Sequence, residues 1–126
     1  MSSHFKPNLV VLKADAAISE GQAVKIGSDS EHVTPCTAAT DKVIGLAQTT
    51  VTAAEDLVEV ALPGGGAKGL AQATISAGSL LVPHTDGKLK PIAAAGNRLC
   101  AVAMDSAVAG DVFDVHVISG QAQATE

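Results

Sequence analysis

The stretch ISEGQAVKI at residues 18–26 decides the fold, because it returns as ISAGSLLVP at residues 75–83. An internal repeat in a sequence indicates a duplicated architecture. When the two stretches are aligned, residues 18–62 and 75–117 keep their apolar, turn and acidic positions in phase with only two single-residue gaps. We therefore predict two structural copies of one unit. The alternative is that two segments rich in Ala, Val and Gly align through composition alone.

The last segment of each copy alternates between apolar and polar residues, which is typical of a β-strand with one buried face. In the second copy, one face carries Phe113, Val115 and Val117, and the other carries Val112, Asp114 and His116. In the first copy, the corresponding faces carry Val58, Val60 and Leu62, and Leu57, Glu59 and Ala61. The first-named set of each copy is predicted to face the core and the second set to face solvent.

Turn signals separate the short apolar segments. Asp86-Gly87 predicts a hairpin between residues 80–82 and 89–91, and glycines at 21, 78 and 110 each precede a predicted strand. Glycine or proline interrupts every longer helical candidate. Neither copy is long enough to hold its own core, so we predict one all-β fold, a small compact β barrel or sandwich built from two pseudo-repeats.

The predicted organisation is a single domain with five segments. A flexible N-terminal arm covers residues 1–8, and the first pseudo-repeat covers 9–62. A glycine-rich linker (PGGGAKGL) covers 63–70, the second pseudo-repeat covers 71–118, and a polar tail covers 119–126.

Composition excludes several classes of function. Among 126 residues the net charge is −5, which argues against nucleic-acid binding, since that needs a clustered basic surface. The chain has no Trp or Tyr and only two Phe, so it lacks the rings on which bases and sugars stack. No apolar run approaches the roughly 20 residues of a membrane helix, and the N-terminus has no signal-peptide core. We expect a soluble protein made in the cytoplasm, with no nucleic-acid or membrane partner.

No pattern of catalytic or ligand-binding residues emerges. The linker resembles a phosphate-binding loop only superficially, because Lys68 is followed by Gly69 and no Ser or Thr comes next. A carrier domain with a modified Lys68 remains an alternative. His116 lies two residues from Asp114, but the first copy has Ala and Glu at those positions, which favours a surface pair.

The two cysteines align with apolar partners in the other copy, Cys36 with Ile92 and Cys100 with Ile44. Both thiols are therefore predicted to be buried hydrophobic groups rather than nucleophiles. We predict no catalytic residue, no cofactor, no metal site and no enzymatic activity.

The sequence resembles the capsid cement, or head decoration, proteins of tailed bacteriophages. The resemblance rests on ISEGQAV at residues 18–24, IGLA at 44–47 and AVAGDVFDV at 107–115, and it extends over about residues 9–118. It implies a β-clip-like fold, as in the phage lambda type, and a structural role. Such proteins bind the outer surface of the expanded capsid, commonly as homotrimers, and clamp neighbouring subunits of the major capsid protein. Their location is the virion, after assembly in the host cytoplasm.

In the lambda type the N-terminal arm orders on the shell, so the candidate capsid contacts here are Phe5, Lys6, Pro7, Asn8 and Leu9. An exposed aromatic residue on an arm is a plausible anchor, and a free arm can add a strand to a partner sheet. The alternative is that Leu9–Leu12 is the first core strand and residues 1–8 are frayed. The alternative function is another phage accessory module, such as a tail, fibre or glycan-binding domain.

Overall fold

The computed structural model describes residues 8–92 and 97–121, and the regular elements within them are all β-strands. The first unit consists of β1 (Leu9–Ala14), β2 (Ala23–Ile26), β3 (His32–Pro35), β4 (Gly45–Ala47) and β5 (Leu57–Ala61). The second unit consists of β6 (Gly66–Leu70), β7 (Leu80–Pro83), β8 (Leu89–Pro91), β9 (Arg98–Ala103) and β10 (Val112–Gln121). No helix in the described ranges is long and apolar enough to cross a membrane.

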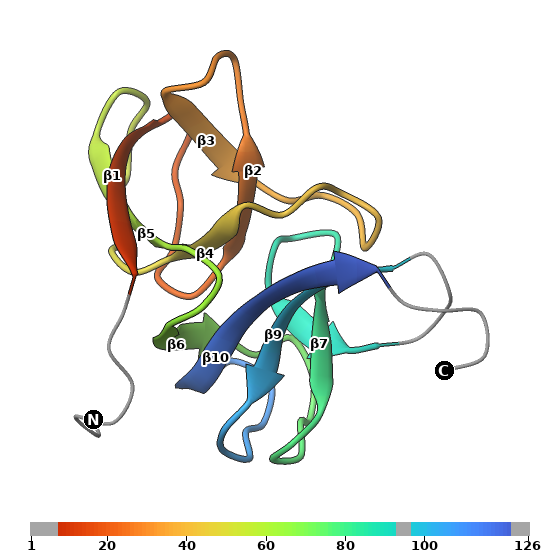
Figure 1. Ribbon diagram of the computed structural model, residues 1–126. Helices are drawn as coiled ribbons and strands as arrows, with labels where there is room; N and C mark the ends of the chain where they lie inside the picture. The colour runs from red at the N-terminus through yellow and green to blue at the C-terminus, as the bar shows by residue number, and fades with distance from the viewer. Residues whose placement is uncertain (1–7, 93–96, 122–126) are drawn as a thin grey trace.

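Figure 1 shows the barrel of the first unit beside the sheet of the second, and the two units pair their strands in the same way. The first unit is a closed barrel in the order β1-β3-β2-β4-β5, and the second is a sheet in the order β6-β10-β9-β7-β8. Followed around the closed barrel in the other direction, the first unit has the order β1-β5-β4-β2-β3, which matches the second unit strand for strand. A parallel bridge between Ala71 and Leu89 links the two ends of the second sheet, just as parallel pairing of Ala14 with Val33 links β1 to β3. The predicted all-β fold built from two pseudo-repeats is confirmed. The expectation that neither copy holds its own core is wrong for the first unit, because a separate hydrophobic cluster lies within its barrel.

The turn before the second strand of each unit shows how closely the copies agree. Gly21 and Gly78 have φ angles of 91° and 90°, a region that L side chains rarely adopt. Each donates its N–H over 2.7 Å, Gly21 to the carbonyl of Ala47 and Gly78 to that of Ala103. The sequence repeat is therefore a repeat of local backbone conformation as well as of strand order.

The predicted alternation is confirmed in β10, where Phe113, Val115 and Val117 are buried. It is also confirmed for most of β5, where Val58 and Val60 are buried while Leu57 and Glu59 are exposed. Ala61 was expected on the solvent face, and this expectation is wrong. Its side chain is fully buried because the second unit covers this end of the barrel's outer surface.

The two units join through backbone hydrogen bonds and a shared hydrophobic cluster. Ala23 N–H donates to the carbonyl of Gly87 over 2.7 Å, and Leu70 N–H donates to that of Gly21 over 3.1 Å. Arg98 N–H also donates across the junction, to the carbonyl of Ala39, over 2.7 Å. The first unit contributes Ala23, Cys36, Leu46 and Ala61 to the main core of the second unit.

The predicted linker over residues 63–70 is wrong for most of its length, because Gly66–Leu70 forms β6 and pairs with β10. Its glycines serve packing as well as flexibility. A Cβ at Gly69 would lie 2.7 Å from Leu89 Cδ1 and 3.1 Å from Val115 Cγ1, so only glycine fits here without a shift of its neighbours. The connection between the units is thus shortened to residues 62–65. The predicted tail also begins later than expected, since β10 extends to Gln121.

Candidate functional site

The sequence-predicted capsid contacts fall partly outside the described structure. Phe5, Lys6 and Pro7 lie outside the described residues, whereas Asn8 and Leu9 are at the start of β1. The carbonyl of Asn8 accepts a 2.7 Å hydrogen bond from Leu62 N–H, and its side-chain amide donates to the carbonyl of Pro63 over 3.3 Å. Leu9 pairs with Ala61 in the β1–β5 ladder and keeps 44% of its surface exposed. The alternative in which β1 begins at Leu9 therefore describes the backbone.

Strand alternation turns two apolar side chains of this ladder outward. Val10 and Leu12 pack against the core of the first unit, so the residue between them, Val11, must face solvent. Val11 is 55% exposed and Leu57 is 65% exposed, which makes Leu57 the most exposed large apolar residue described. Val11 lies directly opposite Glu59 in the ladder. We call the surface made by Leu9, Val11, Leu57 and Glu59 the β1–β5 face.

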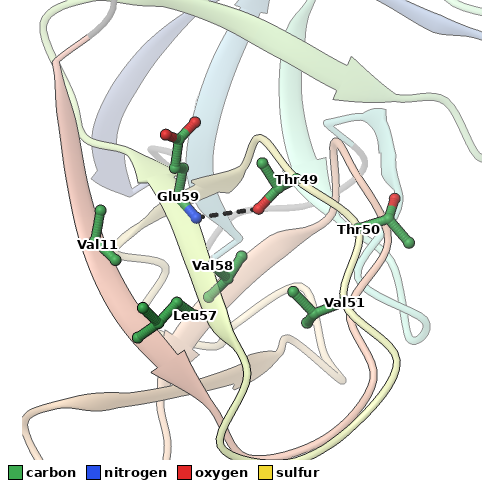
Figure 2. A pocket seen from close by; sticks show the side chains of 7 residues that line it. All are labelled: Val11, Thr49, Thr50, Val51, Leu57, Val58 and Glu59. Atoms are coloured by element: carbon green, nitrogen blue, oxygen red, sulfur yellow. Dashed lines mark hydrogen bonds between the residues drawn. The ribbon is translucent and has the colours of Figure 1, made fainter.

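A groove of about 340 Å³ lies beside this face. Figure 2 shows the side chains around it. Its lining residues are Val11, Thr49, Thr50, Val51, Leu57, Val58 and Glu59. The threonine side is held in place by hydrogen bonds, since Thr49 Oγ1 accepts from Glu59 N–H over 3.2 Å and Thr50 Oγ1 accepts from Glu20 N–H over 3.0 Å. An apolar groove with one carboxylate at its rim suits contact with a polypeptide better than catalysis.

In the second unit, an ion pair lies at the position equivalent to Val11 and Glu59. Lys68 and Asp114 are opposite each other in the β6–β10 ladder, as Val11 and Glu59 are in the first unit. Lys68 Nζ lies 2.5 Å from Asp114 Oδ1. Among the described residues Glu59 has no such partner, because valine stands where the second unit has lysine. Asp114, which lies two residues from His116 in the sequence, makes this cross-strand contact with Lys68.

A polar cluster lies in the first unit near the C-terminal end of β1, where His32 bridges two loops. Its Nδ1 lies 2.7 Å from Asp29 Oδ1 and its Nε2 lies 2.9 Å from Glu55 Oε2. The hydrogen bond to Asp29, followed by the one to Glu55, raises the pKa of His32 above its ordinary value of 6.5. Glu55 adopts a left-handed φ of 73°, which brings its carboxylate to the histidine. The cluster ties two loops together.

Both cysteines are fully buried, as predicted from their apolar partners in the repeat. Burial raises the pKa of the Cys36 thiol to about 12 and raises the pKa of Cys100 as well. Neither forms the thiolate that nucleophilic chemistry needs near neutral pH. Within residues 8–92 and 97–121, no group of three or more His, Cys, Asp or Glu side chains is arranged to hold a metal ion.

Sequence reasoning missed the β1–β5 face. The signal was present, since Leu57 and Glu59 were placed on the solvent side of their strand. The segment from Leu9 to Leu12, however, is continuously apolar and does not say which residues face out. Only the ladder register, which sets Val11 opposite Glu59, brings these side chains onto one surface.

Comparison with known proteins identifies a solved structure with a similar fold. No protein-family model matches the chain, and no curated protein matches it significantly. Among solved structures, it is similar to the N base of the head fiber gp8.5 in bacteriophage phi29. The chain shares the fold of that fiber base. The likeness covers 89% of this chain and 94% of the other, with a TM-score of 0.67 and 16% sequence identity.

Proposed function

We propose that this chain is a structural accessory protein of a bacteriophage virion that binds the outer surface of the expanded capsid. The fold shared with the phi29 head fiber base, over nearly the full length of both chains, is the observation that carries the proposal. The resemblance to head decoration proteins supports the same class of phage structural protein, and it rests on sequence motifs instead of the fold. The proposed location is the virion surface, reached from the host cytoplasm during assembly, and the proposed role is structural rather than enzymatic.

The proposed mechanism is clamping of neighbouring major capsid protein subunits, with homotrimers as the bound form. A clamp must transmit force without deforming, and the junction between the two units suits that requirement. Three backbone hydrogen bonds and a continuous hydrophobic cluster connect the barrel to the second sheet. Close-packed interiors of this kind are stiff and transmit strain.

The phi29 neighbour favours a second candidate, a module that anchors a fibre to the head. The two candidates differ in their effect on the shell. A clamp raises the temperature at which the shell disassembles, whereas a fibre anchor leaves that temperature unchanged.

Co-sedimentation with capsids of the source phage tests the proposal. We expect saturable pelleting with DNA-free expanded shells and none with unexpanded procapsids, because the binding surface spans subunits that move on expansion. Gel staining is the appropriate detection, since the chain has no Trp or Tyr. Absence of pelleting with both shells would contradict capsid binding. Thermal disassembly of the loaded shells then separates the clamp from the fibre anchor.

Deleting residues 1–7 tests the contribution of the predicted arm. We expect weaker binding to expanded shells and an unchanged melting temperature, because the Asn8–Leu62 hydrogen bond that begins the β1–β5 ladder remains. Deleting residues 122–126 at the other end is the matched control and should leave binding intact. Full binding by the chain lacking residues 1–7 would remove Phe5, Lys6 and Pro7 from the contact surface.

A further inference from the structure

One edge of β1 is only partly paired. β3 pairs with β1 only at Lys13 and Ala14, where Lys13 N–H donates to the carbonyl of Glu31 over 2.9 Å. The even-numbered residues of β1 bond in the other direction, toward β5, as Ala14 N–H does to the carbonyl of Asp56. By strand alternation, the backbone groups of Leu9 and Val11 therefore point away from β5. Beyond the two β1–β3 pairs, no described strand pairs with this edge.

The equivalent edge in the second unit, that of β6, shows which hydrogen bonds such an edge can make. Lys68, the equivalent of Val11, donates its N–H to Gln48 Oε1 over 2.9 Å. The carbonyl of Lys68 accepts from Gln48 Nε2 over 3.0 Å. The side-chain amide of Gln48 thus bonds this edge in the same way as the peptide group of a neighbouring strand. In the first unit no described side chain supplies such an amide to Val11, although the fold and the ladder position are the same.

We propose that the Leu9–Val11 edge of β1 accepts an extended segment of the capsid shell protein by β-augmentation. The inference rests on the proposed function and adds the chemistry of the contact. The segment's peptide groups would bond the N–H and C=O of Val11, and an apolar side chain of the segment would lie in the groove beside Val11 and Leu57. A lysine or arginine of the segment would pair with Glu59, as Lys68 pairs with Asp114 in the second unit.

A second copy of this chain is a poorer occupant of the edge. Among the described residues, this edge offers free backbone groups only at Leu9 and Val11, so pairing of β1 with β1 of another copy buries far less than the roughly 1,200 Å² of a stable interface. A segment of the shell needs less from this contact, because in the proposed function the N-terminal arm contributes to shell binding as well. Charge supports the same choice, since the acidic Glu59 would face a second copy that carries the same net charge of −5.

The substitution Val11→Pro tests the edge. It removes the N–H that points away from β5 and leaves the bonds to β5 in place, and proline is tolerated at such edge positions. We expect about tenfold weaker binding to expanded shells, as loss of edge hydrogen bonds predicts. Val11→Thr is the matched control, because it keeps both the N–H and the β-branched shape and should bind like the wild type.

Glu59→Gln tests the charge without risk to the fold, because the side chain is exposed. We expect weaker binding than the wild type at low salt and a smaller loss of binding as salt is added. Hydrogen exchange on the wild-type complex gives a third readout, since the Val11 amide should become protected by the shell.

The outcomes separate this inference from the proposed function. If the wild type does not bind shells, the proposed function fails and the inference fails with it. If the wild type binds and Val11→Pro and Glu59→Gln bind equally well, with no protection of the Val11 amide, the inference alone is wrong. If Val11→Pro instead dissociates an oligomer of the free chain, the occupant is a second copy and the shell segment is excluded.

Discussion

At the scale of single residues, His32 shows how one side chain can hold two loops. A neutral imidazole has one N–H donor, so it can donate to only one of its two carboxylate neighbours. The doubly protonated ring donates to both Asp29 and Glu55, and this explains why the pKa of His32 is raised. The same contact lowers the pKa of Asp29 below 3.8. The loops are therefore best joined when His32 is charged and Asp29 is ionised.

The pH dependence of stability follows from these two directions. Because the folded pKa of His32 is raised, its contribution is fully present below 6.5 and is lost as pH rises through the folded pKa. Because the folded pKa of Asp29 is lowered, its contribution is present above 3.8 and is lost as pH falls through its folded pKa. We expect the stability gap between the wild type and His32→Gln to be largest between these limits and to shrink at alkaline pH.

Imidazole resonances measured by NMR give the direct check. The His32 titration midpoint should lie above 6.5 and should move downward in Asp29→Asn, because the largest cause of the shift is removed. An unchanged midpoint in that variant would show that Asp29 does not hold the ring.

At the scale of elements, β10 places one of the two Phe residues of the chain in the core. Phe113 is 5% exposed and packs with Val115 and Val117 in the shared core. The side chains between them on the strand face outward, so each substitution in β10 should act according to the side of the sheet on which it falls.

Phe113→Ala should therefore destabilise the fold by about 3–5 kcal/mol, through lost burial and the cavity that remains. Val112→Ala, one residue earlier and 48% exposed, should cost less than about 0.5 kcal/mol. Urea unfolding followed by circular dichroism measures both. Similar losses in the two variants would mean that the sheet faces are assigned incorrectly.

At the scale of the whole molecule, the repeat makes it possible to measure the junction between the units. Gly21 and Gly78 are equivalent and share a φ near 90°, but their surroundings differ. A Cβ at Gly21 would lie 2.5 Å from the backbone nitrogen of Leu70 in the other unit, while a Cβ at Gly78 would meet nothing within 4 Å. The first glycine allows close contact between units, and the second allows only a turn.

Gly78→Ala should cost about 1–2 kcal/mol from the left-handed conformation alone. Gly21→Ala should cost a further amount of about 1–3 kcal/mol, because the added methyl group forces the two units apart. The difference between the two free energies of unfolding, measured in urea, isolates the junction. Equal costs would indicate that the units do not depend on close contact at this point.

The sequence by itself determined the features that depend on neighbouring residues. The repeat, the hairpin at Asp86-Gly87, the inward face of β10 and the burial of both cysteines follow from alternation and turn preferences, which act over a few residues. The N-terminal contact candidates did not follow in the same way. Phe5, Lys6 and Pro7 lie outside the described residues, and Leu9 is part of β1.

Only the tertiary structure decided the features that depend on which elements meet. The sequence of the glycine-rich segment predicts a linker, but Gly66–Leu70 is a strand because it pairs with β10. Alternation predicts that Ala61 faces solvent, but the second unit covers it. The β1–β5 face and the bond between Gln48 and Lys68 arise from contacts between residues 20 or more positions apart. Local sequence patterns cannot encode such contacts, because burial and pairing depend on the packing of the whole chain.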